Sequence, residues 1–66
     1  MMPAMTDPLA ELSSVTSAVE ELTRRVTAMA DRFASEKKDD VAADLYAVER
    51  ALAGATRRLA RVVDGR

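Results

Sequence analysis

The chain has 66 residues, with 10 Lys and Arg against 11 Asp and Glu, and it contains no Cys and no His. This composition excludes a disulfide, a zinc site of the usual Cys and His type, and catalysis by a histidine base. The near-zero net charge disfavours generic nucleic-acid binding, which usually comes with a basic excess.

The segment before Asp7 carries no helix signal. We expect residues 1–6 to form a disordered tail and residues 7–66 to form a single helical-hairpin domain. The tail has no basic segment followed by an apolar run, as a signal peptide would, and no stretch reaches the ~18 apolar residues of a transmembrane helix. The sequence therefore predicts a cytoplasmic protein without a membrane segment.

The first predicted helix spans about residues 8–34. Asp7 suits the N-cap and Pro8 suits the first helical position. Apolar residues then recur at alternating spacings of three and four, which is the heptad repeat of a coiled coil, with positions a and d of each repeat abcdefg apolar. With Leu12 at a and Val15 at d, the repeat contains Leu12, Val15, Val19, Leu22, Val26, Met29 and Phe33.

A polar loop is expected over residues 35–40 and a second helix over about residues 40–64. Asp39 or Asp40 is expected to cap the start of this helix and Gly65 its end. Its apolar repeat consists of Val41, Leu45, Val48, Leu52, Ala55, Leu59 and Val62, with Val41 at d. Because the loop is short, the sequence predicts an all-α fold, an antiparallel two-helix hairpin joined along its coiled-coil heptads.

If Phe33 faces Val41, every a and d position meets an apolar residue of the other helix. The e positions then lie on one flank, with the b positions beyond them, and this flank is mostly small or apolar. An apolar arc wider than a two-helix seam indicates a second neighbour. We therefore expect a homodimeric four-helix bundle. Its predicted interface consists of Leu9, Ala30, Ala42, Tyr46, Ala53, Thr56, Ala60 and Val63.

Catalytic and ligand-binding patterns are missing from the sequence. The Ser and Thr residues have no histidine to activate them, and the only two glycines form no phosphate-binding loop. The acidic residues between 36 and 44 lack the spacing of a calcium loop and are better explained by helix ends, where negative charge is favourable. We predict no catalytic residue, no metal ligand and no cofactor.

The second helix carries several arginines that offer contacts to phosphates or to an acidic partner. These are Arg50, Arg57, Arg58 and Arg61. The simpler explanation is a solvated face balanced by acidic residues, since Glu20 and Arg24, for example, have the spacing of a helical ion pair.

Two functions remain open at this point. The favoured one is a non-enzymatic protein–protein interaction and oligomerisation module, an adaptor or regulatory protein that homodimerises and binds a larger protein partner. The alternative is a small nucleic-acid-associated regulator that uses the arginine-rich face of the second helix. The two differ in whether association depends on apolar side chains or on salt-sensitive phosphate contacts.

Overall fold

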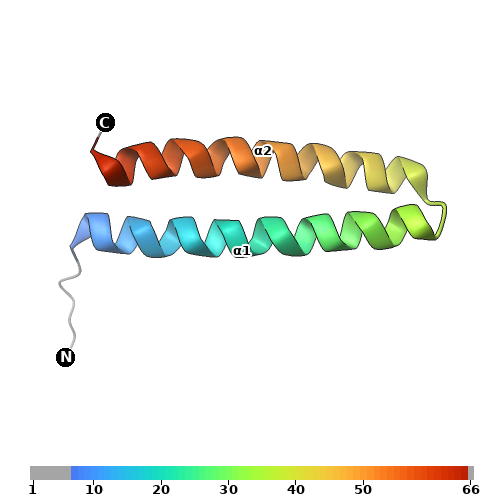
Figure 1. Ribbon diagram of the computed structural model, residues 1–66, viewed down its shortest axis with the longest axis horizontal. Coiled ribbons are helices and arrows are strands. Elements are labelled where there is room, and N and C mark those ends of the chain that lie inside the picture. Colours follow the sequence, from blue (N-terminus) through green and yellow to red (C-terminus); the bar gives the residue numbers. More distant parts are fainter. Residues whose placement is uncertain (1–6, 66) are drawn as a thin grey trace, which may run out of the picture.

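The computed structural model describes residues 7–65, which form two helices, α1 (Pro8–Ser35) and α2 (Asp39–Asp64). The helices run antiparallel and side by side, so that the start of α1 and the end of α2 lie at the same end (Figure 1). The predicted all-helical hairpin is thereby confirmed. The expected tail over residues 1–6 lies outside the described residues, as does Arg66.

The outer ends of both helices are capped as the sequence predicts. The Asp7 carboxylate accepts a hydrogen bond from the backbone N–H of Leu9 at 3.1 Å, and Pro8 occupies the first turn. At the end of α2, Gly65 has a left-handed φ of 82°. Glycine adopts this conformation without steric cost, which is why it terminates helices so often.

The turn between the helices is shorter than expected. Only residues 36–38 connect α1 to α2, in place of the predicted loop over residues 35–40. Lys38 takes the N-cap position of α2 without a side-chain hydrogen bond, so neither Asp39 nor Asp40 occupies the N-cap position. The Asp40 carboxylate nevertheless accepts a hydrogen bond from the free backbone N–H of Val41 in the first turn, at 2.9 Å. Both aspartates instead lie in the first turn of α2, where their charge is favourable to the helix dipole.

Backbone hydrogen bonds make this tight reversal. The N–H of Lys38 donates to the carbonyl of Phe33 at 2.9 Å, and the N–H of Lys37 donates to that of Ala34 at 3.0 Å. This pair of bonds is the Schellman pattern that closes a helix end. Lys37 adopts a left-handed φ of 64°, which costs a non-glycine residue about 1–2 kcal/mol.

The two helices meet through their a and e positions. Three e residues are the most deeply buried in the described chain, with Ala30 0%, Ala42 3% and Thr16 9% exposed. Half-buried a residues alternate with them along the contact. These a residues are Leu12, Val19, Val26, Phe33, Leu45, Leu52 and Leu59.

The predicted a/d seam is therefore wrong at its d positions. Six large apolar side chains at d are between 38% and 53% exposed. They are Val15, Leu22 and Met29 on α1 and Val41, Val48 and Val62 on α2, and together they are called the apolar face below. Residues expected inside the hairpin thus lie outside it, and residues expected on its flank lie inside.

Small side chains at e explain this rotation of the helices. Alanine lets the two backbones approach closely, whereas leucine or methionine at the same place would hold them apart. Threonine fits as well, because its hydroxyl bonds within its own helix and leaves its methyl group to pack. The Thr16 hydroxyl donates to the Leu12 carbonyl at 2.9 Å, and the Thr56 hydroxyl donates to that of Leu52 at 2.9 Å.

The hairpin is one layer thick. Its shortest dimension is 11 Å, which is about the diameter of a single helix. Domains are ordinarily built from two layers that bury a core between them. Here neither broad face of the single layer is covered by another element of the described chain.

The buried small residues give a test of this packing. We expect Ala30→Leu to lower the free energy of unfolding by about 1–3 kcal/mol, because the added side chain has no space between the helices. Ala28→Leu, at an exposed position of the same helix, is the matched control and should change it by less than about 0.5 kcal/mol. Urea unfolding followed by circular dichroism, at one protein concentration, measures both. Equal effects of the two substitutions would contradict the a/e contact.

Candidate functional site

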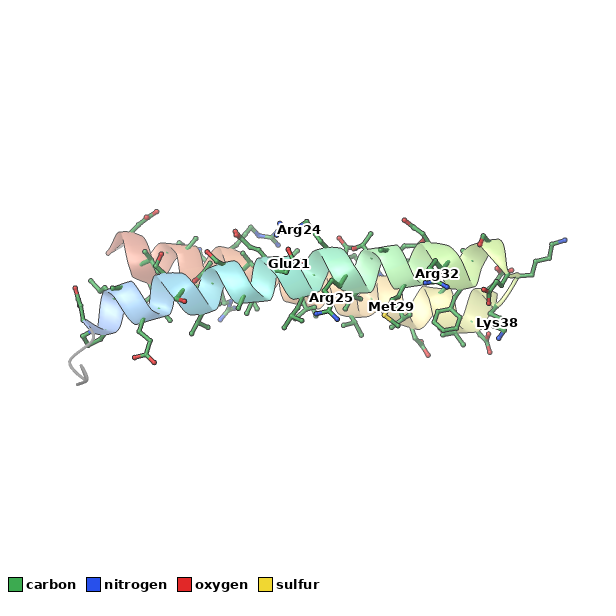
Figure 2. All side chains as sticks on the ribbon, turned by 90° about the horizontal axis from the view of Figure 1, so that it is seen from below. Glu21, Arg24, Arg25, Met29, Arg32 and Lys38 are labelled. Atoms are coloured by element: carbon green, nitrogen blue, oxygen red, sulfur yellow. The ribbon has the colours of Figure 1, made fainter. Side chains whose placement is uncertain are left out.

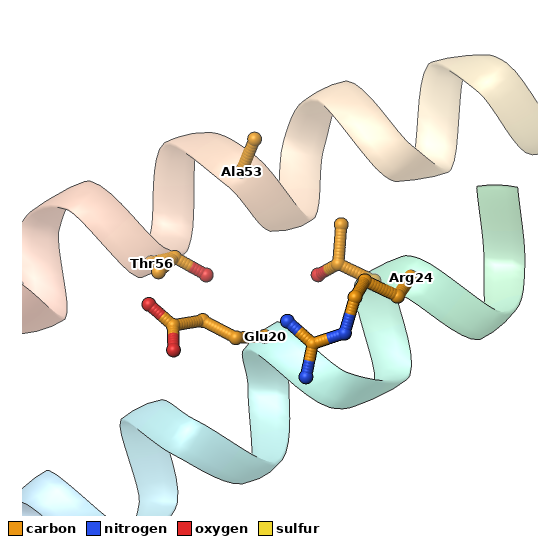
Figure 3. A pocket seen from close by; sticks show the side chains of 5 residues that line it. Glu20, Arg24, Ala53 and Thr56 are labelled. Atoms are coloured by element: carbon orange, nitrogen blue, oxygen red, sulfur yellow. The ribbon is translucent and has the colours of Figure 1, made fainter.

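One broad face of the hairpin carries small and polar side chains. An open hollow on it is lined by side chains from both helices (Figure 3). These are Glu20, Thr23 and Arg24 of α1 and Ala53 and Thr56 of α2. Glu20 and Ala53 are b positions, so the b positions of both helices lie on this side, which is called the polar side below.

Tyr46, another b residue, joins the two helices on the polar side. Its hydroxyl donates a hydrogen bond to the carboxylate of Asp31 on α1. This hydrogen bond, together with partial burial and the charges of Asp31 and Glu49, raises the pKa of Tyr46 above its ordinary value. The tyrosine therefore already has a partner within its own hairpin.

The apolar face lies on the opposite side. Positions b and d are about 160° apart around a helix. Because both helices turn their b positions to the polar side, both turn their d positions away from it. Figure 2 agrees, since Met29 and Arg25 lie toward the opposite edge of α1 from Arg24. The hairpin thus places its exposed valines, Leu22 and Met29 on a single face two helices wide.

Charged residues at the g positions border the apolar face. They are Glu11, Arg25 and Arg32 on α1 and Asp44 and Arg58 on α2, and all are exposed. Met29 and Arg32 line one hollow, which places this charge directly beside an apolar-face residue. Within residues 7–65, the ion pairs are Arg24 with Glu21 at 2.6 Å and Lys38 with Glu36 at 4.0 Å, so none of the bordering charges is paired. The expected pairing of Arg24 with Glu20 is replaced by Glu21.

The structure separates the residues of the predicted dimer interface. Ala30 and Ala42 are buried between the helices of one chain and have no surface to offer a second chain. The others either remain exposed or lie half-buried along the helix contact and the polar side. Leu9 and Ala60 are exposed, whereas Tyr46, Ala53, Thr56 and Val63 are half-buried. The sequence signal for the apolar face is that most e residues are small. Small e residues can pack between the helices in place of the larger d residues, which then remain exposed.

The arginines of α2 do not lie on one surface. Arg50, Arg57 and Arg61 occupy f and c positions, which are on the outer side of the helix, and Arg58 borders the apolar face. All four are exposed, and none forms an ion pair within the described part of the chain. Three of them therefore remain accessible from outside whatever covers the apolar face.

No three acidic side chains between residues 7 and 65 gather as a metal site requires. Neither α1 nor α2 has a stretch apolar enough to cross a membrane. Comparisons with protein-family models, curated proteins and solved structures found no match to this chain.

The hydrogen bond between the helices predicts how the only tyrosine titrates. We expect the pKa of Tyr46 to lie above about 10 and to fall when Asp31→Asn removes the carboxylate. Because the protonated phenol is the bonded form, this stabilisation is present below the unfolded pKa and is lost as the pH rises through the folded one. Tyrosinate absorbance measures the pKa. Asp44→Asn is the control, and equal pKa values in the two variants would contradict the bond.

Proposed function

We propose that this chain is a non-enzymatic protein–protein interaction module that self-associates and serves as an adaptor or regulatory protein. The observation that carries the proposal is the apolar face. Six large apolar side chains are about half exposed on one side of a hairpin that is a single layer thick. Extended apolar surface of this kind marks sites of protein association.

Covering the apolar face changes the stability of the hairpin substantially. Full burial of a valine, leucine or methionine is worth roughly 1.5–3 kcal/mol, so burying the exposed half of each is worth about 1 kcal/mol. For six side chains this amounts to roughly 6 kcal/mol per chain. The buried contact within one chain is modest, since only Thr16, Ala30 and Ala42 are buried among the described residues. Association therefore contributes to folding as well as to binding.

The shape of the apolar face favours another pair of helices as its partner. The face is long, straight and two helices wide, so a second hairpin laid upon it forms the two-layer arrangement of a four-helix bundle. The proposal keeps the homodimer that the sequence predicts. It moves the interface from the e and b positions to the d positions.

A larger protein partner binds elsewhere in this proposal. When the apolar face is covered, the outer side of α2 with Arg50, Arg57 and Arg61 stays accessible. Arginine suits recognition of carboxylates because its planar guanidinium donates two parallel hydrogen bonds. We assign this side to an acidic partner surface.

The apolar face can be tested by a single charge. We expect Leu22→Glu to convert the dimer into a monomer, because the substitution places two unpaired carboxylates in the apolar interface. Light scattering after size exclusion measures the mass in solution. Ala53→Glu on the polar side is the matched control and should leave the dimer intact.

The opposite result for these two variants would place the interface on the polar side. If Ala53→Glu dissociates the dimer and Leu22→Glu does not, the chains associate through the polar side. A wild-type chain that is monomeric at all concentrations would contradict self-association itself.

A further inference from the structure

The charges that border the apolar face point to a specific arrangement of the dimer, an inference that rests on the proposed self-association. We propose that a second copy of this chain covers the apolar face, related by a two-fold axis that lies between the two chains, runs perpendicular to the helices, and crosses α1 beside Leu22 and α2 beside Ala51. Each helix then lies antiparallel to the same helix of the second copy. In such a contact, the same surface patch of both chains must be complementary to itself.

The first row of charges, on α1, has this self-complementarity. Its g positions read Glu11, Ala18, Arg25 and Arg32, acidic at one end and basic at the other. A two-fold axis beside Leu22 brings Glu11 opposite Arg32 of the second copy. It also brings Val15 opposite Met29 and Leu22 opposite itself, so that the apolar and the charged rows match in one register.

The second row, on α2, shows the same order. Its g positions read Asp44, Ala51 and Arg58, again acidic first and basic last. A two-fold axis beside Ala51 brings Asp44 opposite Arg58 of the second copy. The same axis brings the d positions opposite one another, with Val41 opposite Val62 and Val48 opposite Ala55.

The same two-fold axis can pass the centres of both rows, because the turn sets the two helices in register with each other. Ser35 ends α1 and Asp39 begins α2. Leu22 and Leu52 each lie thirteen residues from these ends, so they are at about the same height along the hairpin. The centre of the α2 row, Ala51, is one residue from Leu52. The folded register thus aligns two centres that the sequence alone does not relate.

The other two-fold arrangement pairs fewer charges. If α1 lay on α2 of the second copy, Arg32 would come near Asp44, but Glu11 would face Gly65 and Arg58 would face Ala18. The arrangement in which each helix packs on its own copy pairs Glu11, Arg32, Asp44 and Arg58. All four are exposed and form no ion pair within residues 7–65, so each is available to the second chain.

Charge exchange distinguishes the two arrangements. We expect Arg32→Glu to raise the dimer dissociation constant roughly tenfold at low salt, because two attractive pairs per dimer become repulsive. Adding Glu11→Arg should restore it, whereas adding Asp44→Arg should not. Sedimentation equilibrium measures the three constants. Rescue by Asp44→Arg in place of Glu11→Arg would overturn the proposed axis.

A disulfide across the axis gives the most direct test. The chain has no cysteine of its own, so Leu22→Cys introduces a single thiol beside the axis. On mild oxidation of the native protein, we expect a covalent dimer, because a disulfide needs two Cβ atoms about 4 Å apart and only a residue at the axis meets itself so closely. Ala28→Cys, on the exposed outer side of α1, is the control and should link far more slowly.

The outcomes separate this inference from the proposed function. A dimer by light scattering whose Leu22→Cys variant links no faster than Ala28→Cys would overturn the axis while leaving self-association in place. Linking of Leu22→Cys to an Ala55→Cys chain in a mixture, without linking to itself, would assign the other arrangement. A monomeric wild-type chain would overturn the proposed function and the inference together.

Discussion

The close packing of small side chains at the e positions sets the rotation of both helices. Ala30 and Ala42 are almost fully enclosed, and Thr16 and Thr56, farther along the same line, satisfy their hydroxyls within their own helix. The helices approach each other along this line because alanine and threonine hold them apart less than leucine or methionine would. The larger d residues are then turned outward, and the hairpin shows one polar side and one apolar face.

This rotation links the fold to the proposed function. A hairpin that buried its a and d positions would use its large side chains internally and have little left for a partner. The observed hairpin leaves Leu22, Met29 and four valines exposed, and its single layer cannot cover them. The tight turn at Lys37 matters for the same reason, because it fixes the height at which the two helices present their charges to a second chain.

The sequence predicts the two helices, the cap at Asp7 and the glycine end at Gly65, since these depend on local backbone chemistry. It does not determine which apolar positions meet inside the chain. Positions a and d are apolar, and the e positions are small or apolar except for Glu49, so either flank of a can complete the contact. Because threonine is polar, the sequence places Thr16 and Thr56 on the flank of the hairpin. In the structure their hydroxyls bond to carbonyls of their own helix, so that both residues can pack at the contact between the helices. The short turn could not be predicted either, because lysine rarely adopts the left-handed conformation that Lys37 has here.

The central claim is that this hairpin is half of a core and that its folding is coupled to association. Thermal unfolding across a hundredfold range of protein concentration tests it most directly, with helicity followed by circular dichroism. The account predicts a midpoint that rises with concentration, because a partner chain that binds only the folded state stabilises it by mass action. A fully helical chain whose midpoint is the same at every concentration would contradict it.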